Sequence, residues 1–292
     1  MTFYIKTGSA IFNKKLKDLL ESRGYEYSRS FPVDIVFLTG EAAYYRERQD
    51  LKRSKFVNVI YPRPAITYKD KLYRMFAKEP FIPKIHNLTD LPETFLKILK
   101  PTDGYAGEGI TVVTNKQEIQ NWIQSHHASS WVVQDYVSDP DLKEGKKFHI
   151  RVHVVVIGNK VFLCKEIRYY LAKEDYVRAD WKNKDIHDTH YIEGQNDYLF
   201  PQDLPDGWDS GSLTGIKHIV KTVFKGIHVK PDWNGQHAYY IFGVDVMFSR
   251  KKAILLEVND RVGLSERSVE TLIPGVLDLL HGTIPGTFVK ME

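Results

Sequence analysis

Two carboxylates and an amide towards the end of the chain are the residues whose types and spacing best fit chemistry. Asp245 lies in one apolar, β-prone run, and Glu257 and Asn259 lie in the next, while the polar segment Ser249–Lys252 between them suits a hairpin turn. Side chains alternate between the faces of a strand, so Glu257 and Asn259 share a face that Asp245 can meet. Such oxygen ligands suit Mg²⁺ held together with substrate phosphates. Because a carboxylate in an apolar strand needs a partner, we interpret the three residues as a metal site rather than as exposed strand ends.

A row of basic side chains follows one face of a predicted strand earlier in the chain. Lys147, His149, Arg151 and His153 alternate with apolar residues, and Arg168 on the following strand is expected to lie near this row across a hairpin. A solvated face would more commonly mix charges of both signs. A row of one sign suits phosphate oxygens or a carboxylate, which an arginine binds through two parallel hydrogen bonds.

A glycine-rich loop follows Lys100 and lies between two predicted strands. Gly104, Gly107 and Gly109 allow backbone N–H groups to turn towards an anion, although their spacing matches neither a P-loop nor a dinucleotide-binding loop. On its own such a loop is more often a flexible surface hairpin, and Lys100 is a candidate phosphate ligand only in this context. The strand Trp131–Val137 is either an ordinary core strand or an edge that contacts a flat heterocycle, and the pattern leaves both interpretations open.

The elements that position these residues begin with a small α/β lobe. We predict strands over residues 3–5, 33–38 and 56–60 and helices over 12–22 and 41–52. This alternation implies a parallel sheet. After a linker at 61–64, we predict helices over 66–78, 116–125, 210–225 and 265–280, and strands over 95–100, 110–113, 131–137, 148–157, 160–168, 240–248 and 253–259. Residues 171–208 show little periodicity, so we expect loops and short helices there.

The composition is that of an ordinary soluble globular protein. Of the 292 residues, 42% are hydrophobic and 27% are charged, and the net charge of +4 without a long block of one sign gives no indication of nucleic-acid binding. The single cysteine, Cys164, excludes an internal disulfide and favours a reducing compartment. No run approaches the roughly 20 apolar residues that span a bilayer, and no secretory signal is visible. We therefore expect a monomeric cytoplasmic protein that binds neither membranes nor nucleic acid.

Five motifs in sequence give the chain a resemblance to a known family. They are Lys100-Pro101 before the glycine loop, Val132-Val-Gln-Asp-Tyr-Val137, Lys147-Phe-His-Ile-Arg151, Gly243-Val-Asp-Val-Met247 and Leu256-Glu-Val-Asn259. In this order and spacing, the chain from about Val57 to Gly282 resembles the tubulin tyrosine ligase-like family of ATP-grasp amino acid ligases. The resemblance implies a mixed α/β ATP-grasp fold with a small N-terminal parallel βαβ lobe (1–65), a central lid subdomain (66–130) and a C-terminal catalytic subdomain with an antiparallel sheet (131–292).

The resemblance also implies parts for individual residues. Those that match nucleotide-binding positions are Lys69, Lys100, Gly107, Gly109, Gln134, Asp135, Tyr136, Val137, Lys147, His149, His187 and Asp188. Within this set, Lys69 and Lys100 would bind the ATP phosphates beneath the glycine loop, which would act as a lid, and residues 134–137 would bind adenine. The residues that match catalytic positions are Arg151 and Arg168, which would hold the acceptor carboxylate and its acyl phosphate, and Glu257. The residues that match Mg²⁺ ligands are Asp245, Glu257 and Asn259.

Three places depart from the pattern of the family. His149 stands where the motif normally has Asp, Ala106 stands where the glycine loop often has Arg, and His187-Asp188 falls where the family usually has Thr-Asn beside the nucleotide. The histidine removes an acidic nucleotide contact, which is compatible with an altered ATP geometry or a reduced activity.

The activity that the resemblance implies is an ADP-forming, ATP- and Mg²⁺-dependent amide ligation. An acidic or C-terminal carboxylate of a protein or peptide would become an acyl phosphate, and a free amino acid (tyrosine, glutamate or glycine) would displace the phosphate. Tubulin is an acceptor by analogy, and the basic segment Tyr44–Lys55 is either a docking surface for an acidic tail or a solvated helix. Two alternatives stay open: a nucleotide-binding pseudoenzyme or interaction module, which His149 motivates, and an ATP-grasp ligase for a small-molecule acceptor.

Overall fold

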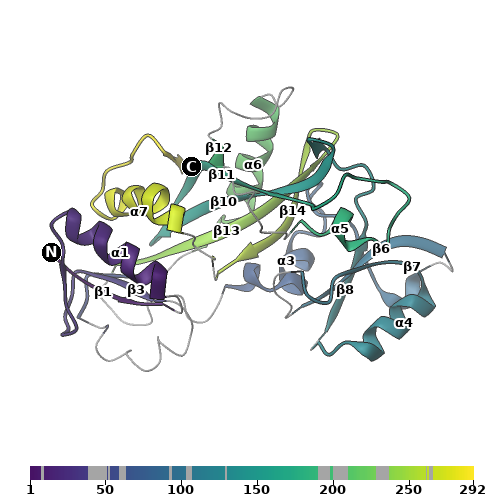
Figure 1. Ribbon diagram of the computed structural model, residues 1–292, viewed down its shortest axis with the longest axis horizontal. Coiled ribbons are helices and arrows are strands. Elements are labelled where there is room, and N and C mark those ends of the chain that lie inside the picture. The colour runs from purple at the N-terminus through teal and green to yellow at the C-terminus, as the bar shows by residue number, and fades with distance from the viewer. Residues whose placement is uncertain are drawn as a thin grey trace.

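Two β-sheets and the helices that cover them make up the described part of the chain (Figure 1). The structure is a computed structural model, and it describes residues 1–7, 10–38, 51, 53–58, 64–91, 94–102, 107–128, 130–189, 198–199, 210–227, 237–260, 262 and 266–292. Within these ranges, no helix has the length and apolar character needed to cross a bilayer. The predicted helix over 41–52, apart from Leu51, and the linker at 61–64, apart from Pro64, lie outside the described residues.

The large sheet runs through most of the molecule. Its described strands are β1 (Thr2–Lys6), β2 (Glu26–Tyr27), β3 (Ile35–Leu38), β4 (Phe56–Val57), β9 (Leu142–Lys143), β10 (Lys146–Ile157), β11 (Lys160–Leu171), β12 (Tyr198–Leu199), β13 (His237–Ser249), β14 (Lys252–Asn259) and β15 (Phe288–Met291). The strands β1 to β4 pair in parallel, as predicted, and the later strands pair with one another in antiparallel fashion. The first residues of β13 pair in parallel with β4, so the two halves form one continuous sheet.

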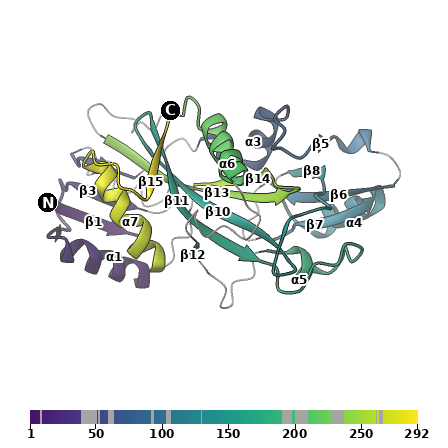
Figure 2. The same ribbon diagram turned by 90° about the horizontal axis from the view of Figure 1, so that it is seen from above.

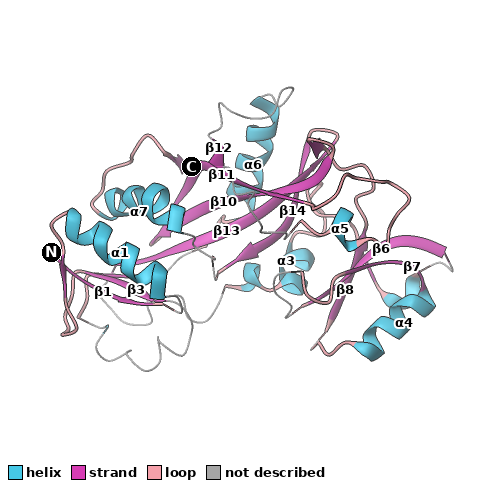
Figure 3. Cartoon of the chain, viewed as in Figure 1, coloured by secondary structure: helices cyan, strands magenta, loops and turns pink. Residues whose placement is uncertain are grey.

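The second sheet is antiparallel and has four described strands. They are β5 (Ile85–His86), β6 (Thr94–Pro101), β7 (Thr111–Asn115) and β8 (Trp131–Asp135). The predicted mixed α/β class is therefore confirmed, with a large mixed sheet and a separate antiparallel one (Figure 3). Strand β8 belongs to this small sheet, although the predicted boundary at residue 130 assigned it to the C-terminal subdomain. The three subdomain boundaries stay predictions.

The helices cover both faces of the large sheet. The described helices are α1 (Ala10–Ser22), α3 (Lys69–Met75), α4 (Lys116–Ser125), α5 (Lys184–His187), α6 (Ser210–Val223) and α7 (Glu266–Leu280), with 3₁₀ turns η1 (Ala65–Thr67) and η2 (Leu88–Asp90). Apolar residues of α6 pack with Val154 and Phe242 on one face, and those of α1 and α7 pack with Val155 and Ile241 on the other. In Figures 1 and 2, α1 and α7 lie beside the N-terminal strands, and the small sheet with α4 lies at the opposite end.

Most predicted elements lie where the periodicity put them, and the differences are local. The predicted helix over 66–78 is wrong in its extent: Tyr68 has an extended backbone (φ −99°, ψ 121°), which separates the 3₁₀ turn η1 from α3. Strand β11 continues to Leu171, three residues beyond the prediction, and β8 ends at Asp135 rather than at residue 137. Strand β15 was not predicted, because its short sequence becomes a strand only by pairing with β11.

The packing of α6 on β14 gives a prediction about stability. Gly215 approaches the strand so closely that an added Cβ atom would lie 3.0 Å from the Cβ atom of Ala253. Gly215→Val is therefore expected to push α6 away from the strand that carries Glu257 and to lower the free energy of unfolding by about 1–3 kcal/mol. Urea denaturation measures this change.

A matched control is Thr214→Val, which places the same β-branched side chain at the neighbouring, exposed position of α6. Its effect is expected to stay within about 0.5 kcal/mol. Equal losses of stability in both variants would contradict the packing argument.

Candidate active site

A cleft of about 500 Å³ is lined by residues of both sheets and of α3, α4 and α5. Predicted site residues that line it are Lys69, Lys100, Gly107, Gln134, Asp135, Tyr136, Val137, Lys147, His149, His187, Asp188, Asp245 and Glu257. The remaining predicted residues, Gly109, Arg151, Arg168 and Asn259, are not part of this lining. The structure thus gathers most of the predicted nucleotide set around a single cleft.

The two carboxylates and the amide meet at one point of the hairpin, which is formed by β13 and β14. Asp245 and Glu257 are direct cross-strand neighbours, and a register shift follows at Val246. The amide nitrogen of Asn259 donates to Asp245 Oδ2 at 3.1 Å and to Glu257 Oε1 at 2.9 Å. The turn between the strands has positive φ at Arg250 (50°) and Lys251 (61°), which matches the twist of a tight hairpin.

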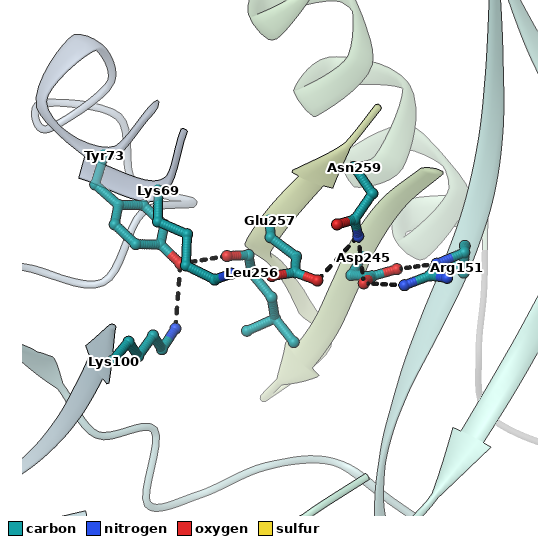
Figure 4. Close-up of polar contacts among 8 residues, drawn as sticks. All are labelled: Lys69, Tyr73, Lys100, Arg151, Asp245, Leu256, Glu257 and Asn259. Atoms are coloured by element: carbon teal, nitrogen blue, oxygen red, sulfur yellow. Dashed lines mark hydrogen bonds and ion pairs between the residues drawn. The ribbon is translucent and has the colours of Figure 1, made fainter. Parts of the chain in front are cut away.

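Each of these carboxylates has a positively charged partner. Arg151 binds Asp245 through two hydrogen bonds of 2.6 Å, from Nε to Oδ1 and from Nη2 to Oδ2, and Lys69 Nζ lies 3.0 Å from Glu257 Oε2 (Figure 4). Burial by itself raises the pKa of Glu257, but Lys69 and Asn259 outweigh this and lower the pKa well below its usual range. Burial raises the pKa of Asp245 despite the nearby guanidinium, and the Glu257 carboxylate adds to that rise.

The donor set has the chemistry that Mg²⁺ prefers, namely two carboxylates and one amide oxygen. Among the described residues no group of three or more His, Cys, Asp and Glu side chains is arranged to hold a metal ion, and the third oxygen of the predicted set is the amide oxygen of Asn259. The residues therefore fit Mg²⁺, an ion that takes only one or two protein carboxylates. In this structure the amide nitrogen faces the carboxylates, and Lys69 and Arg151 provide the compensating charge.

Two buried lysines extend the charged part of the cleft. Lys100 Nζ donates to the hydroxyl of Tyr73 at 3.2 Å, and burial, opposed by Glu257, lowers its pKa to about 7. Lys147 Nζ donates to the hydroxyl of Tyr136 at 3.1 Å, and burial lowers its pKa to about 8 although Asp188 opposes the change. Burial thus disfavours the protonated form of both lysines, and an anionic ligand bound beside them would stabilise it.

An amide and a flat aromatic wall form another part of the cleft. Gln134 is fully buried, its Nε2 donates to the carbonyl of Pro83 at 3.3 Å, and its Oε1 has no hydrogen-bond partner among the described residues. The hydroxyl of Tyr136 lies 2.7 Å from His187 Nδ1, and the Trp181 ring stacks on His187 at 5.9 Å. Because His187 Nε2 lies 2.7 Å from the carbonyl of Asp180, which can only accept, Nε2 carries the proton.

The carboxylate of Asp135 contacts side chains of the small sheet. Its Oδ1 lies 2.7 Å from His86 Nε2 and 2.9 Å from Lys97 Nζ. Burial raises the pKa of Asp135, but the hydrogen bonds from Lys97 and His86 outweigh it and lower the pKa below the usual value. Asp135 therefore has internal partners, while Gln134 beside it keeps an acceptor available.

His149 lies between the charged and aromatic parts of the cleft. Its Nδ1 is 2.6 Å from the hydroxyl of Thr189, and its ring stacks on Tyr170 at a centroid distance of 4.7 Å. The threonine hydroxyl at this place thus comes from Thr189, one residue beyond the His187-Asp188 pair to which the resemblance pointed. The sequence held a signal for it, because Thr189 is the only threonine between residues 171 and 208.

The two arginines predicted to work together lie side by side. Arg151 and Arg168 are direct neighbours across β10 and β11, and their guanidinium carbons lie 5.3 Å and 4.9 Å from the centre of the Tyr170 ring. Burial lowers the pKa of His153 to about 3, and both arginines contribute to the decrease, so this histidine is neutral at pH 7. The basic row therefore holds its positive charge on the arginines rather than on His153.

The end of the glycine loop is fixed to α4. Gly107 and Gly109 have φ of 75° and 73°, in the region that favours glycine. The carbonyl of Gly109 accepts a hydrogen bond of 2.9 Å from Trp122 Nε1, and Trp122 lines the cleft. Gly104 and Ala106 lie outside the described residues. Tyr73, Trp122 and Trp181 are cleft residues that sequence reasoning missed.

A model of the tubulin–tyrosine ligase family matches residues 44–196 of the chain. Among curated proteins, a probable tubulin–tyrosine ligase of Schizosaccharomyces pombe is 30% identical over 166 residues, which are 51% of this chain and 39% of that protein. A tubulin polyglutamylase of Homo sapiens is 24% identical over 200 residues, 56% of this chain and 22% of that protein. A tubulin polyglutamylase of Mus musculus is 27% identical over 208 residues, which are 59% of this chain and 24% of that protein. The chain thus matches less than half the length of these relatives.

The ion pair between Arg151 and Asp245 gives a prediction that needs no ligand. Asp245→Asn leaves a guanidinium buried without its counter-charge, so the free energy of unfolding is expected to fall by about 3–5 kcal/mol. Asp278→Asn is the matched control, because Asp278 forms a half-exposed pair with Arg23 at 3.7 Å and its loss costs less than about 1 kcal/mol. Chemical denaturation of both variants measures the difference. Equal stabilities would show that Arg151 does not depend on Asp245.

Proposed function

The chain belongs to the tubulin–tyrosine ligase family, and we propose that it is an ATP- and Mg²⁺-dependent ligase that joins a protein or peptide carboxylate to an amino acid. The observation that carries the proposal is that two charged groups line one cleft and that a third contacts this lining through the ion pair of Arg151 with Asp245. These are the carboxylate pair Asp245 and Glu257, the buried lysines Lys100 and Lys147, and the adjacent pair Arg151 and Arg168. A binding protein for a neutral ligand would have no use for so many buried charges.

Different residues of the cleft bind the phosphates and the base of the nucleotide. Lys100 and Lys69 orient the phosphates, while Gln134 offers its free oxygen to an N–H group of the base and Tyr136 and Trp181 contact its flat face. Bound Mg²⁺, held by Asp245, Glu257 and Asn259, would neutralise charge on the phosphates. The positively charged partners of the two carboxylates, Lys69 and Arg151, are then available to anionic oxygens of the substrates.

The chemical step is a phosphoryl transfer followed by an acyl transfer. A carboxylate oxygen of the acceptor attacks the γ-phosphorus, the bond to the β–γ bridging oxygen breaks, and ADP leaves. The amine of the amino acid then attacks the acyl carbon, phosphate leaves with the C–O electron pair, and the nitrogen loses a proton. Arg151 and Arg168 hold the anionic oxygens of the acyl phosphate through charge-assisted hydrogen bonds. Exclusion of water by the cleft protects this intermediate from hydrolysis.

The relatives' names supply the substrate class for the proposal. They are called tubulin–tyrosine ligase and tubulin polyglutamylase, so tubulin is the first acceptor to test, with tyrosine and glutamate as donors and glycine as a third. The alternative is a nucleotide-binding module without ligase activity. The observation that favours it is His149, because the imidazole contacts Thr189 where the family motif normally has a carboxylate.

Glu257→Gln is expected to reduce ligase activity by at least about 100-fold, because it removes a proposed metal ligand. The measurement combines ADP release with the mass gain of tubulin incubated with ATP, Mg²⁺ and labelled amino acids. Glu270→Gln, on an exposed side chain of α7, is the matched control and should retain wild-type activity. Mg²⁺-dependent ATP binding by the wild-type protein, with no mass gain across a broad panel of acceptors, would favour the binding module instead.

The pH dependence of ATP binding follows from Lys100. A protonated lysine binds phosphate, and burial lowers the pKa of Lys100 to about 7, so affinity is lost as the pH rises above that value. The Kd for ATP is expected to increase about tenfold between pH 7 and 8.5, a range in which the phosphates are already ionised. Isothermal titration calorimetry measures it.

Two controls accompany this titration. Lys100→Arg should make the profile less steep, because a guanidinium stays protonated throughout the range while Lys147, with a pKa of about 8, still titrates. Adenosine, which has no phosphate, should bind the wild-type protein with nearly the same Kd at both pH values. An equally steep profile for Lys100→Arg would exclude Lys100 as the titrating group.

A further inference from the structure

Tyr73 is a fully buried cleft residue that has no part in the chemistry proposed so far. It lies on α3, four residues after Lys69, so both side chains project from the same face of the helix. Lys69 reaches the side chain of Glu257, and Tyr73 reaches the backbone carbonyl of Leu256. One face of α3 therefore holds two consecutive residues of β14.

The directions of the hydrogen bonds at the Tyr73 hydroxyl are fixed by its partners. The carbonyl of Leu256 can only accept, so the hydroxyl donates to it. The ammonium of Lys100 can only donate, so the hydroxyl accepts from it at 3.2 Å. Burial raises the pKa of Tyr73, and the Glu257 and Asp245 carboxylates add to this rise, so the hydroxyl keeps the proton that it donates.

This hydroxyl joins elements of both sheets. Lys100 comes from β6 of the small sheet, and Leu256 comes from β14 of the large sheet (Figure 4). Among the described residues, the ammonium of Lys100 has no other hydrogen-bond partner. The same ammonium also lies 5.3 Å from the centre of the Tyr73 ring. Tyr73 thus sets where Lys100 stands relative to the hairpin that carries Glu257.

We propose that Tyr73 is a positioning residue whose hydroxyl holds the Lys100 ammonium at the phosphate end of the cleft. The inference rests on the proposed function, since it takes the ligand of Lys100 to be the polyphosphate of a nucleotide. Tyr73 acts through Lys100 and does not itself contact the reacting atoms. Its loss should therefore weaken the binding of a nucleotide with phosphates and leave the binding of the nucleoside unchanged.

The first test compares ATP with adenosine in the Tyr73→Phe variant, which keeps the ring and removes only the hydroxyl. The Kd for ATP with Mg²⁺ is expected to rise about tenfold or more, because a hydrogen bond to a charged group is lost. The Kd for adenosine should stay within about twofold of the wild-type value. Tyr25→Phe is the matched control: it removes a hydroxyl that contacts His281 at 2.7 Å, far from the cleft residues in sequence, and should change neither Kd.

The second test is a double-mutant cycle with Lys100→Met. If Tyr73 acts through Lys100, Tyr73→Phe should have no further effect on ATP binding once Lys100 is replaced. Additive losses would overturn the inference, as would a parallel loss of ATP and adenosine binding, which would reveal a general structural part for Tyr73.

The outcomes separate this inference from the proposed function. If the wild-type protein binds ATP and the Tyr73→Phe variant binds it equally well, only the positioning role of Tyr73 is overturned. A wild-type protein that binds neither ATP nor adenosine would overturn the proposed function, and the inference with it.

Discussion

The site depends on one constraint: two carboxylates are placed side by side in a buried part of a sheet. Asp245 and Glu257 are cross-strand neighbours, and like charges at that separation repel strongly where little water screens them. Removal of one partner from a buried ion pair is costly, so each carboxylate needs a charge that stays in place. The structure supplies Lys69 from α3, Arg151 from β10 and the Asn259 amide from β14. The positions of these elements are therefore coupled through charge as well as through apolar packing.

The same face of the large sheet serves both packing and chemistry. At one end of the strands, Val155 and Ile241 lie in the core beneath α1 and α7. Farther along β10 and β13, Arg151 and Asp245 lie on that same face, where they bind each other. Strict alternation explains how one strand can do both, since the face that is apolar beneath the helices becomes polar where the cleft begins. The opposite face stays apolar beneath α6 and anchors the strands.

Features set by local period were predictable, and features set by distant contacts were not. Alternation along the strands placed Glu257 beside Asn259 and Arg168 near the basic row that includes Arg151, and in the structure both pairs are neighbours. The pair of Arg151 with Asp245 spans 94 residues, and sequence reasoning had assigned the two to different ligands.

Tyr73 was missed for the same reason as that pair. Its hydrogen-bond partners lie 27 and 183 residues away, and no periodicity of α3 reports them. The continuity of the sheet likewise depends on the long-range pairing of β4 with β13, which the sequence of neither strand predicts. Local pattern therefore identified the catalytic candidates, while the residues that position them required the fold.

The distribution of charge in the cleft and directly beside it favours the proposed ligase over a nucleotide-binding module. A neutral part, with the Gln134 amide and the stacked rings of Trp181 and His187, suits a flat heterocycle, and the part around Lys100 suits its phosphates. Those two parts are sufficient to bind a nucleotide. Arg151 and Arg168 are not part of the cleft lining, yet Arg151 binds the Asp245 carboxylate and Arg168 is its direct neighbour across β10 and β11, at the cost of burying positive charge. Such a pair has a use when a second anionic group must meet the phosphates, and an acceptor carboxylate is that group in an amide ligase.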